Sequence, residues 1–146
     1  MRKVIAAIIV CLLQLPRGAL AQDFCQSINL VVSEAAADYA NIQGEDQGDN
    51  YYASSIVLPG ASDCYIDRSD VTAFRCSWKM NSTEEVMASA INFANSIHTC
   101  FPQAPTQERQ TESGPAYNVY LNDLEVRVSA KTERNRVLLQ LAPRNR

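Results

Sequence analysis

Cysteine is the residue type whose number and spacing most clearly indicate a chemistry in this chain. Cys11 lies near the N-terminus, and the other four cysteines are Cys25, Cys64, Cys76 and Cys100. An even number of cysteines in a small exported domain is typical of a disulfide framework. Structural zinc sites usually take their ligands in close pairs, whereas this sequence has no C-x₂-C pair and one histidine. We therefore expect two disulfides and no metal site, with three pairings possible from the count alone.

Catalytic residues are harder to find. His98 is the only candidate for a histidine base, and it stands two positions before Cys100 in a segment expected to be helical, where such residues point to different faces. Glu84 and Glu85 form a carboxylate pair, but acidic side chains are also favourable in the first turn of a helix. The acidic segment 43–50 lacks the ligand spacing of an EF-hand loop and is interpreted as a solvated linker. The sequence predicts no catalytic residue and no cofactor, and we expect the protein not to be an enzyme.

The N-terminal residues have the pattern of a bacterial secretory signal peptide. A short cationic start precedes an apolar run over residues 4–15, and residues 19–21 match an A-x-A cleavage site. The apolar run is shorter than the ~20 residues of a membrane-spanning helix. We therefore expect residues 1–21, with Cys11, to be removed. The mature protein is then periplasmic or secreted and has no membrane span.

Charge is unevenly distributed along the expected mature chain. Three of the thirteen Lys and Arg residues lie before residue 22, which leaves ten against sixteen Asp and Glu and a net charge of −6. This acidity argues against nucleic-acid binding, which needs clustered cations. No Lys or Arg occurs between Arg17 and Arg68. Cations gather instead towards the C-terminus: Arg127, Lys131, Arg134, Arg136, Arg144 and Arg146. Such segregation either steers a charged partner or neutralises itself across the sheet, and the sequence leaves both open.

Hydrophobic periodicity predicts the elements that position these residues. In the first half, apolar side chains every three or four positions favour a helix over 24–42. A strand over 51–58 follows, and alternating side chains then favour a hairpin built from 62–67 and 71–79.

The hairpin alternation also favours one disulfide pairing. Cys64 and Cys76 fall on the same face of the hairpin and lie opposite each other if it turns near Asp70. This parity favours the pair Cys64–Cys76. Cys25–Cys100 then joins the start of the first helix to the end of the second. Trp78 shares the face of Cys76 and is expected in the core.

In the second half of the chain, the sequence predicts one helix followed by three strands. Ser82 and Glu85 form an S-x-x-E capping box, and Pro102 marks the end of the helix that it opens. The segment 102–116 contains three prolines and is interpreted as an exposed loop. Alternating apolar residues then predict three strands, at 117–121, 124–131 and 137–141.

Together these patterns predict an α+β fold in a single domain over 22–146. We expect a two-layer sandwich in which two helices pack on a mainly antiparallel sheet of five to six strands, in the order αβββαβββ. In element order alone the chain resembles the type III secretion chaperones. That resemblance implies a two-layer fold and no function, because those chaperones are cytoplasmic and lack this signal and these cysteines.

The function class follows from these features and from the exposed loop. We expect a small exported binding or accessory domain, a protein-interaction module of the inhibitor or immunity type, whose partner is another exported protein. The alternative is a small periplasmic hydrolase whose site forms only in three dimensions.

Overall fold

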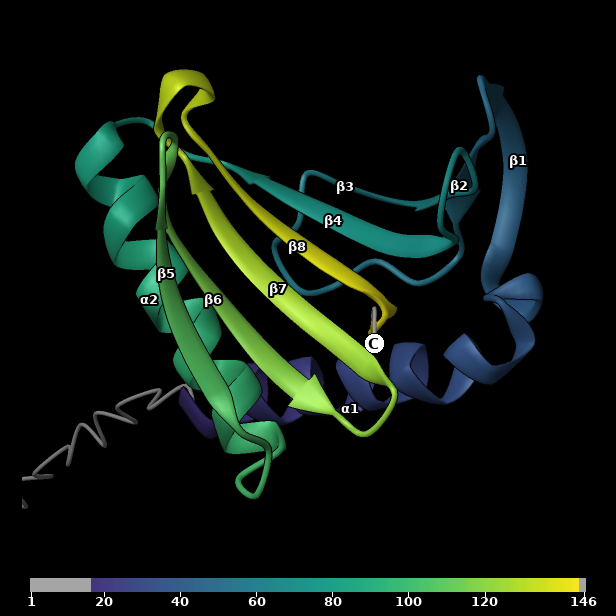
Figure 1. Ribbon diagram of the computed structural model, residues 1–146, viewed down its shortest axis with the longest axis horizontal. Coiled ribbons are helices and arrows are strands. Elements are labelled where there is room, and N and C mark those ends of the chain that lie inside the picture. Colours follow the sequence, from purple (N-terminus) through teal and green to yellow (C-terminus); the bar gives the residue numbers. More distant parts are fainter. Residues whose placement is uncertain (1–16, 145–146) are drawn as a thin grey trace, which may run out of the picture.

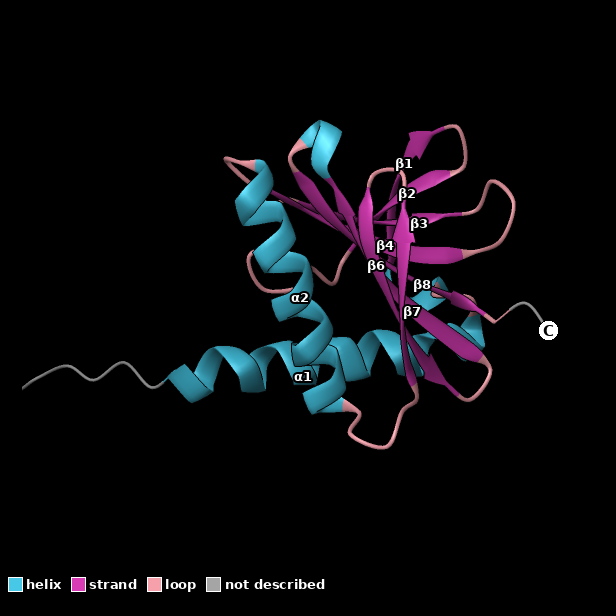
Figure 2. Ribbon diagram, turned by 60° about the vertical axis from the view of Figure 1, so that its left-hand side comes forward, coloured by secondary structure: helices cyan, strands magenta, loops and turns pink. Residues whose placement is uncertain are grey.

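The computed structural model of the protein describes residues 17–144, with side chains described from residue 23 onward. Two long helices lie on one face of a single eight-stranded antiparallel sheet (Figures 1 and 2). The α+β class is confirmed, but the predicted sheet of five to six strands is wrong. The helices and strands are α1 (Arg17–Glu34), β1 (Gln43–Gly48), β2 (Tyr51–Ser54), β3 (Asp63–Asp67), β4 (Ala73–Lys79), α2 (Thr83–Cys100), β5 (Thr106–Thr111), β6 (Gly114–Leu121), β7 (Leu124–Lys131) and β8 (Arg136–Pro143).

The strand order divides the sheet into two similar halves. Across the sheet the strands run β1-β2-β3-β4-β8-β7-β6-β5. Each half is therefore one helix followed by a four-stranded meander, and the two meanders meet where β4 pairs with β8. This arrangement places β1 and β5 at opposite edges of the sheet (Figure 1).

β1 and β5 are the two strands that the sequence analysis missed. The segment 43–50 was interpreted as a linker and 102–116 as a loop, but 43–48 pairs with β2 and 106–111 pairs with β6. Every side chain of β5 is exposed, as are five of the six in β1. An edge strand hydrogen-bonds to one neighbour and needs no buried side chain. Hydrophobic alternation, on which the prediction rested, is therefore absent from both.

The first helix also ends earlier than predicted. α1 stops at Glu34 rather than at residue 42, and two 3₁₀ turns, Ala35–Ala37 and Ala40–Ile42, follow it. Between the turns, Asp38 and Tyr39 adopt left-handed backbone angles, with φ of 50° and 59°. The buried Tyr39 hydroxyl donates a hydrogen bond to the carbonyl of Leu141, at 3.0 Å. This long-range contact accompanies the break in the helix.

The core lies between the two helices and the sheet. Phe24, Ile28 and Val31 of α1 meet apolar side chains of α2 and of the central strands. Trp78 is 4% exposed, and its ring centroid lies 4.3 Å from that of Phe93 in α2. Its indole Nε1 donates a hydrogen bond to the carbonyl of Pro59 at 3.1 Å. Trp78 is thus a core residue, as expected.

Each layer of the fold contains one disulfide. Cys25 of α1 is bonded to Cys100 at the end of α2, and Cys64 of β3 is bonded to Cys76 of β4. These are the pairs expected from the sequence. Cys64 and Cys76 are also direct partners in the strand register.

The N-terminal end of α2 has the expected cap. The backbone N–H of Glu85 donates to the hydroxyl of Ser82 at 3.2 Å, and the Glu85 carboxylate accepts from the backbone N–H of Asn81 at 2.8 Å. Together these bonds satisfy donors that the helix itself leaves free.

Most of the predicted signal peptide lies outside the described residues. α1 begins at Arg17 and runs through the expected cleavage site before residue 22. Neither α1 nor α2, the long helices of the described part, combines the length and the apolar character that crossing a membrane requires.

Candidate functional site

One face of the sheet carries no helix (Figure 2). Along β7, Val126, Val128 and Ala130 belong to the core, so the residues between them point to the uncovered face. The strand register aligns one polar residue from each of six neighbouring strands into a row across this face. From β5 to β3 the row is Gln107, Asn118, Arg127, Gln140, Arg75 and Tyr65.

A cavity of about 310 Å³ lies on this uncovered face. Four cationic side chains line it: Arg75, Arg109, Arg127 and Lys131. They come from β4, β5 and β7, and no Asp or Glu is among the lining residues. Polar groups of Tyr65, Asn118, Ser129 and Gln140 contribute to the walls. The cavity therefore brings together positive charge on a domain whose overall charge is negative.

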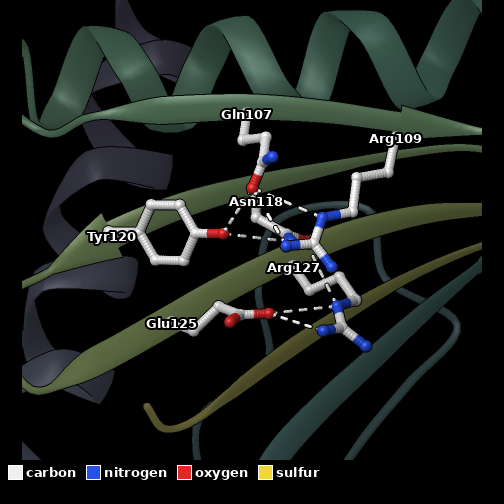
Figure 3. Close-up of polar contacts among 6 residues, drawn as sticks. All are labelled: Gln107, Arg109, Asn118, Tyr120, Glu125 and Arg127. Carbon is white, nitrogen blue, oxygen red and sulfur yellow. Dashed lines mark hydrogen bonds and ion pairs between the residues drawn. The ribbon is translucent and has the colours of Figure 1, made fainter. Parts of the chain in front are cut away.

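Hydrogen bonds among β5, β6 and β7 hold one side of the cavity in place (Figure 3). The Arg127 guanidinium donates to the side-chain oxygen Oδ1 of Asn118 at 3.2 Å and to a Glu125 carboxylate oxygen at 2.7 Å. Arg109 donates to the Gln107 side-chain oxygen at 3.0 Å. The Tyr120 hydroxyl donates to the same oxygen at 2.9 Å.

This network is anchored in the sheet. Asn118 is 1% exposed although no helix covers its face. Arg127 is thus held by a buried partner, which reduces the side-chain freedom that it would lose on binding, whereas Arg109 and its partner Gln107 are both exposed.

On the other side of the cavity, Arg75 forms an ion pair with the buried carboxylate of Asp67 at 2.9 Å. Burial alone would raise the pKa of Asp67. Hydrogen bonds from the hydroxyl and the backbone N–H of Ser69, together with the charge of Arg75, outweigh burial and lower that pKa. Burial raises the pKa of the Tyr65 phenol, and Arg75 opposes that rise. Near neutral pH, Asp67 is therefore ionised and Tyr65 is neutral.

Arg75 also has an unused donor. Its Nε atom is buried and has no hydrogen-bond acceptor within the described part of the chain. Leaving such a buried donor unpaired costs about 1–3 kcal/mol.

The charge segregation seen in the sequence is only partly neutralised in the fold. Arg136 lies 4.0 Å from Asp63 and donates to the hydroxyl of Ser77, which in turn donates to Asp63. Across residues 23–144, Arg109 and Lys131 have no carboxylate within ion-pair distance. The uncovered face thus carries two cations, Arg109 and Lys131, that no carboxylate of the described residues pairs with.

The candidate residues from the sequence do not meet at this cavity. His98 is exposed on α2, Cys100 is held in a disulfide, and Glu84 and Glu85 lie in the first turn of α2. No three His, Cys, Asp or Glu side chains gather as a metal site in the part of the chain that the structure describes.

The sequence analysis named Arg127 and Lys131 only as part of a cationic C-terminal segment and did not single out Arg75 or Arg109, although a signal for Arg75 was present. The alternation that placed Cys76 and Trp78 in the core also placed Arg75 on the opposite face, and Arg127 alternates with core valines in the same way. What the sequence could not supply was the strand order, which brings residues from β4, β5 and β7 to one place.

A second hollow, of about 1010 Å³, lies where the end of α1, the segment after α2 and the β6–β7 turn meet. Its walls are mainly apolar, and its charged lining residues are Asp123 and Arg144. The Arg144 guanidinium lies 4.5 Å from the centre of the Tyr120 ring. Because four cationic side chains line the first cavity and one, Arg144, lines the second, the first cavity is the better candidate for a site.

Comparisons of the sequence with protein-family models and with curated proteins give no match.

Proposed function

We propose that the protein is an exported binding domain whose uncovered sheet face binds an acidic segment of another exported protein. The observation that carries this proposal is the cavity of about 310 Å³, which four cations line without any carboxylate. Two of the four, Arg109 and Lys131, form no ion pair within the described residues, so an anionic group that enters the cavity is attracted by cations that are not yet paired. The predicted export signal and the disulfides of the chain support a partner outside the cytoplasm.

The chemistry of the lining residues favours carboxylates. An arginine guanidinium is a planar fork that can donate two parallel hydrogen bonds to one carboxylate. Arg127 and Arg75 already hold one carboxylate each, from Glu125 and Asp67. Arg109 and Lys131 have none, and they are the side chains left to hold a carboxylate from a partner.

The hydrolase alternative receives less support from the same cavity. Its lining contains neither a histidine nor a carboxylate, which are the most frequent general bases of hydrolases. Cys76 lines the cavity but is bonded to Cys64 and has no free thiol.

Charge reversal at the cavity tests the proposal. A labelled hexaglutamate peptide is titrated into the mature protein at low salt, and binding is followed by fluorescence anisotropy. Lys131→Glu should weaken binding at least tenfold, because it converts a cation of the cavity into an anion. Arg134→Glu is the matched control, since Arg134 is an exposed arginine of the β7–β8 turn that does not line the cavity.

The outcomes separate the possible sources of the anion. Competition by inorganic phosphate but not by acetate or glutamate would assign the cavity to phosphate groups and overturn the acidic segment. Equal weakening by Arg134→Glu and Lys131→Glu would show that the peptide senses net charge rather than the cavity, and would also overturn the proposal.

A further inference from the structure

The two edges of the sheet are built differently. The pairing of β1 with β2 contains two register shifts, and β1 includes Gly44 and Gly48. Irregularities of this kind twist an edge and protect it from further pairing. β5, in contrast, pairs with β6 through six consecutive residues without a shift, and all its side chains are exposed. Within the described residues, β5 has no neighbour on its outer side (Figure 1).

The backbone groups on the free side of β5 can be assigned from one hydrogen bond. The N–H of Tyr120 donates to the carbonyl of Pro105 at 3.0 Å, so these residues form a hydrogen-bonded pair. In an antiparallel ladder such pairs alternate with pairs whose backbone groups point away from the neighbour. By this alternation the N–H and C=O groups of Thr106, Glu108 and Gln110 point outward.

We infer that the free edge of β5 is the docking element, and that an extended segment of the partner pairs with it as a ninth strand. The inference rests on the proposed function and gives its mode of binding. Main-chain hydrogen bonds to an exposed edge are a recurring way of recognising extended peptides. Arg109 and Thr111 belong to β5 and also line the cationic cavity, so a segment docked on this edge lies beside the proposed site.

The charged side chains of β5 indicate which residues a partner strand should carry. Arg109 points to the uncovered face, and Glu108, its neighbour in the chain, points to the helix face. A partner strand therefore fits best with an acidic residue opposite Arg109 and, one position along, a basic residue opposite Glu108. Opposite charges placed directly across two strands stabilise the pairing, and like charges destabilise it.

A second copy of this chain fits the edge poorly. If β5 strands of two copies pair antiparallel about a two-fold axis, one residue of the first strand lies directly opposite the same residue of the second. The two registers centred on the strand place Glu108 opposite Glu108, or Arg109 opposite Arg109. Both put like charges face to face, so the edge favours a different chain.

The test uses the blocked peptide TVEKVT, which in the antiparallel register places its glutamate opposite Arg109 and its lysine opposite Glu108. Hydrogen exchange of individual amides is followed by NMR during titration of the mature protein. We expect the peptide to slow exchange at least tenfold at Thr106, Glu108 and Gln110. The exchanged-charge peptide TVKEVT should bind at least tenfold more weakly.

A proline placed at an outward-pointing position of β5 removes the N–H that a partner strand would bond to. It leaves the hydrogen bonds between β5 and β6 in place, because those come from the alternate residues. Glu108→Pro should abolish peptide binding, whereas Glu108→Ala, which loses the same carboxylate, should keep it within about threefold, because only the proline blocks the edge. If Glu108→Pro is poorly folded by circular dichroism, Gln110→Pro against Gln110→Ala makes the same comparison.

Each result bears on one of the two proposals. Equal binding of TVEKVT to the proline and alanine variants, or unchanged exchange at the three outward amides, overturns docking on β5. The hexaglutamate titration tests the cavity independently, because it depends on Lys131 of β7. If Lys131→Glu leaves hexaglutamate binding unchanged while TVEKVT still slows amide exchange in β5, the proposed function is overturned instead.

Discussion

The two disulfides close loops of very different length and should differ in their contribution to stability. Cys25–Cys100 spans 75 positions and Cys64–Cys76 spans 12. On the loop-entropy model, the long loop contributes about 4.5 kcal/mol and the short one about 2.8 kcal/mol to the free energy of unfolding. We therefore expect the bridge between the helices to stabilise the fold by roughly 1.7 kcal/mol more than the bridge within the hairpin.

Two double variants isolate these contributions. Cys64→Ala with Cys76→Ala keeps only the long bridge, and Cys25→Ala with Cys100→Ala keeps only the short one. Each variant is unfolded in urea with and without a thiol reductant, so the two measurements differ only in the S–S bond and the two hydrogens that replace it. Reduction should lower the free energy of unfolding more in the variant with the long bridge. Equal losses, or a larger loss on reducing the hairpin bridge, would refute the loop-entropy reasoning for this fold.

Three further substitutions test the core and its buried polar groups. Trp78→Ala should lower the free energy of unfolding by about 3–5 kcal/mol, measured by urea denaturation, because it empties a packed position between the sheet and α2. Tyr39→Phe should cost about 1 kcal/mol in the same assay, since the carbonyl of Leu141 loses its hydrogen bond from the tyrosine hydroxyl. The lowered pKa of Asp67 predicts a contribution that is complete above the unfolded-state pKa of about 4 and is lost as the pH falls below it. Asp67→Asn should therefore be less stable than the wild type at pH 7 and lose less stability between pH 5 and pH 2.

The parts of the fold that bury apolar side chains were predictable from the sequence. β3, β4, β7 and α2 lie within a few positions of their expected ranges, because each alternates or repeats apolar residues on one face. The same parity argument led to the pair Cys64–Cys76. What escaped prediction was structure without buried side chains, namely β1 and β5.

Two other differences arise from long-range contacts. The pattern over 24–42 continues past the true end of α1, since Tyr39 is apolar and correctly spaced for a helix. In the fold its hydroxyl bonds to β8, in the other half of the chain, and its backbone leaves the helical region. The cationic cavity likewise depends on strand order, because Arg75 and Arg127 are brought together only when β8 lies between β4 and β7.

The single junction between the two meanders has a consequence for folding kinetics. Within each meander, neighbouring strands follow one another in the chain and need only short loops to pair. Phe74 pairs with Leu141 and Lys79 with Arg136, so the partners across the β4–β8 junction are roughly 60 positions apart and form the most non-local contacts of the sheet. Meeting of the two preformed meanders is then the expected rate-limiting event. Substitutions at the junction should slow folding, whereas substitutions at the outer strands should mainly accelerate unfolding.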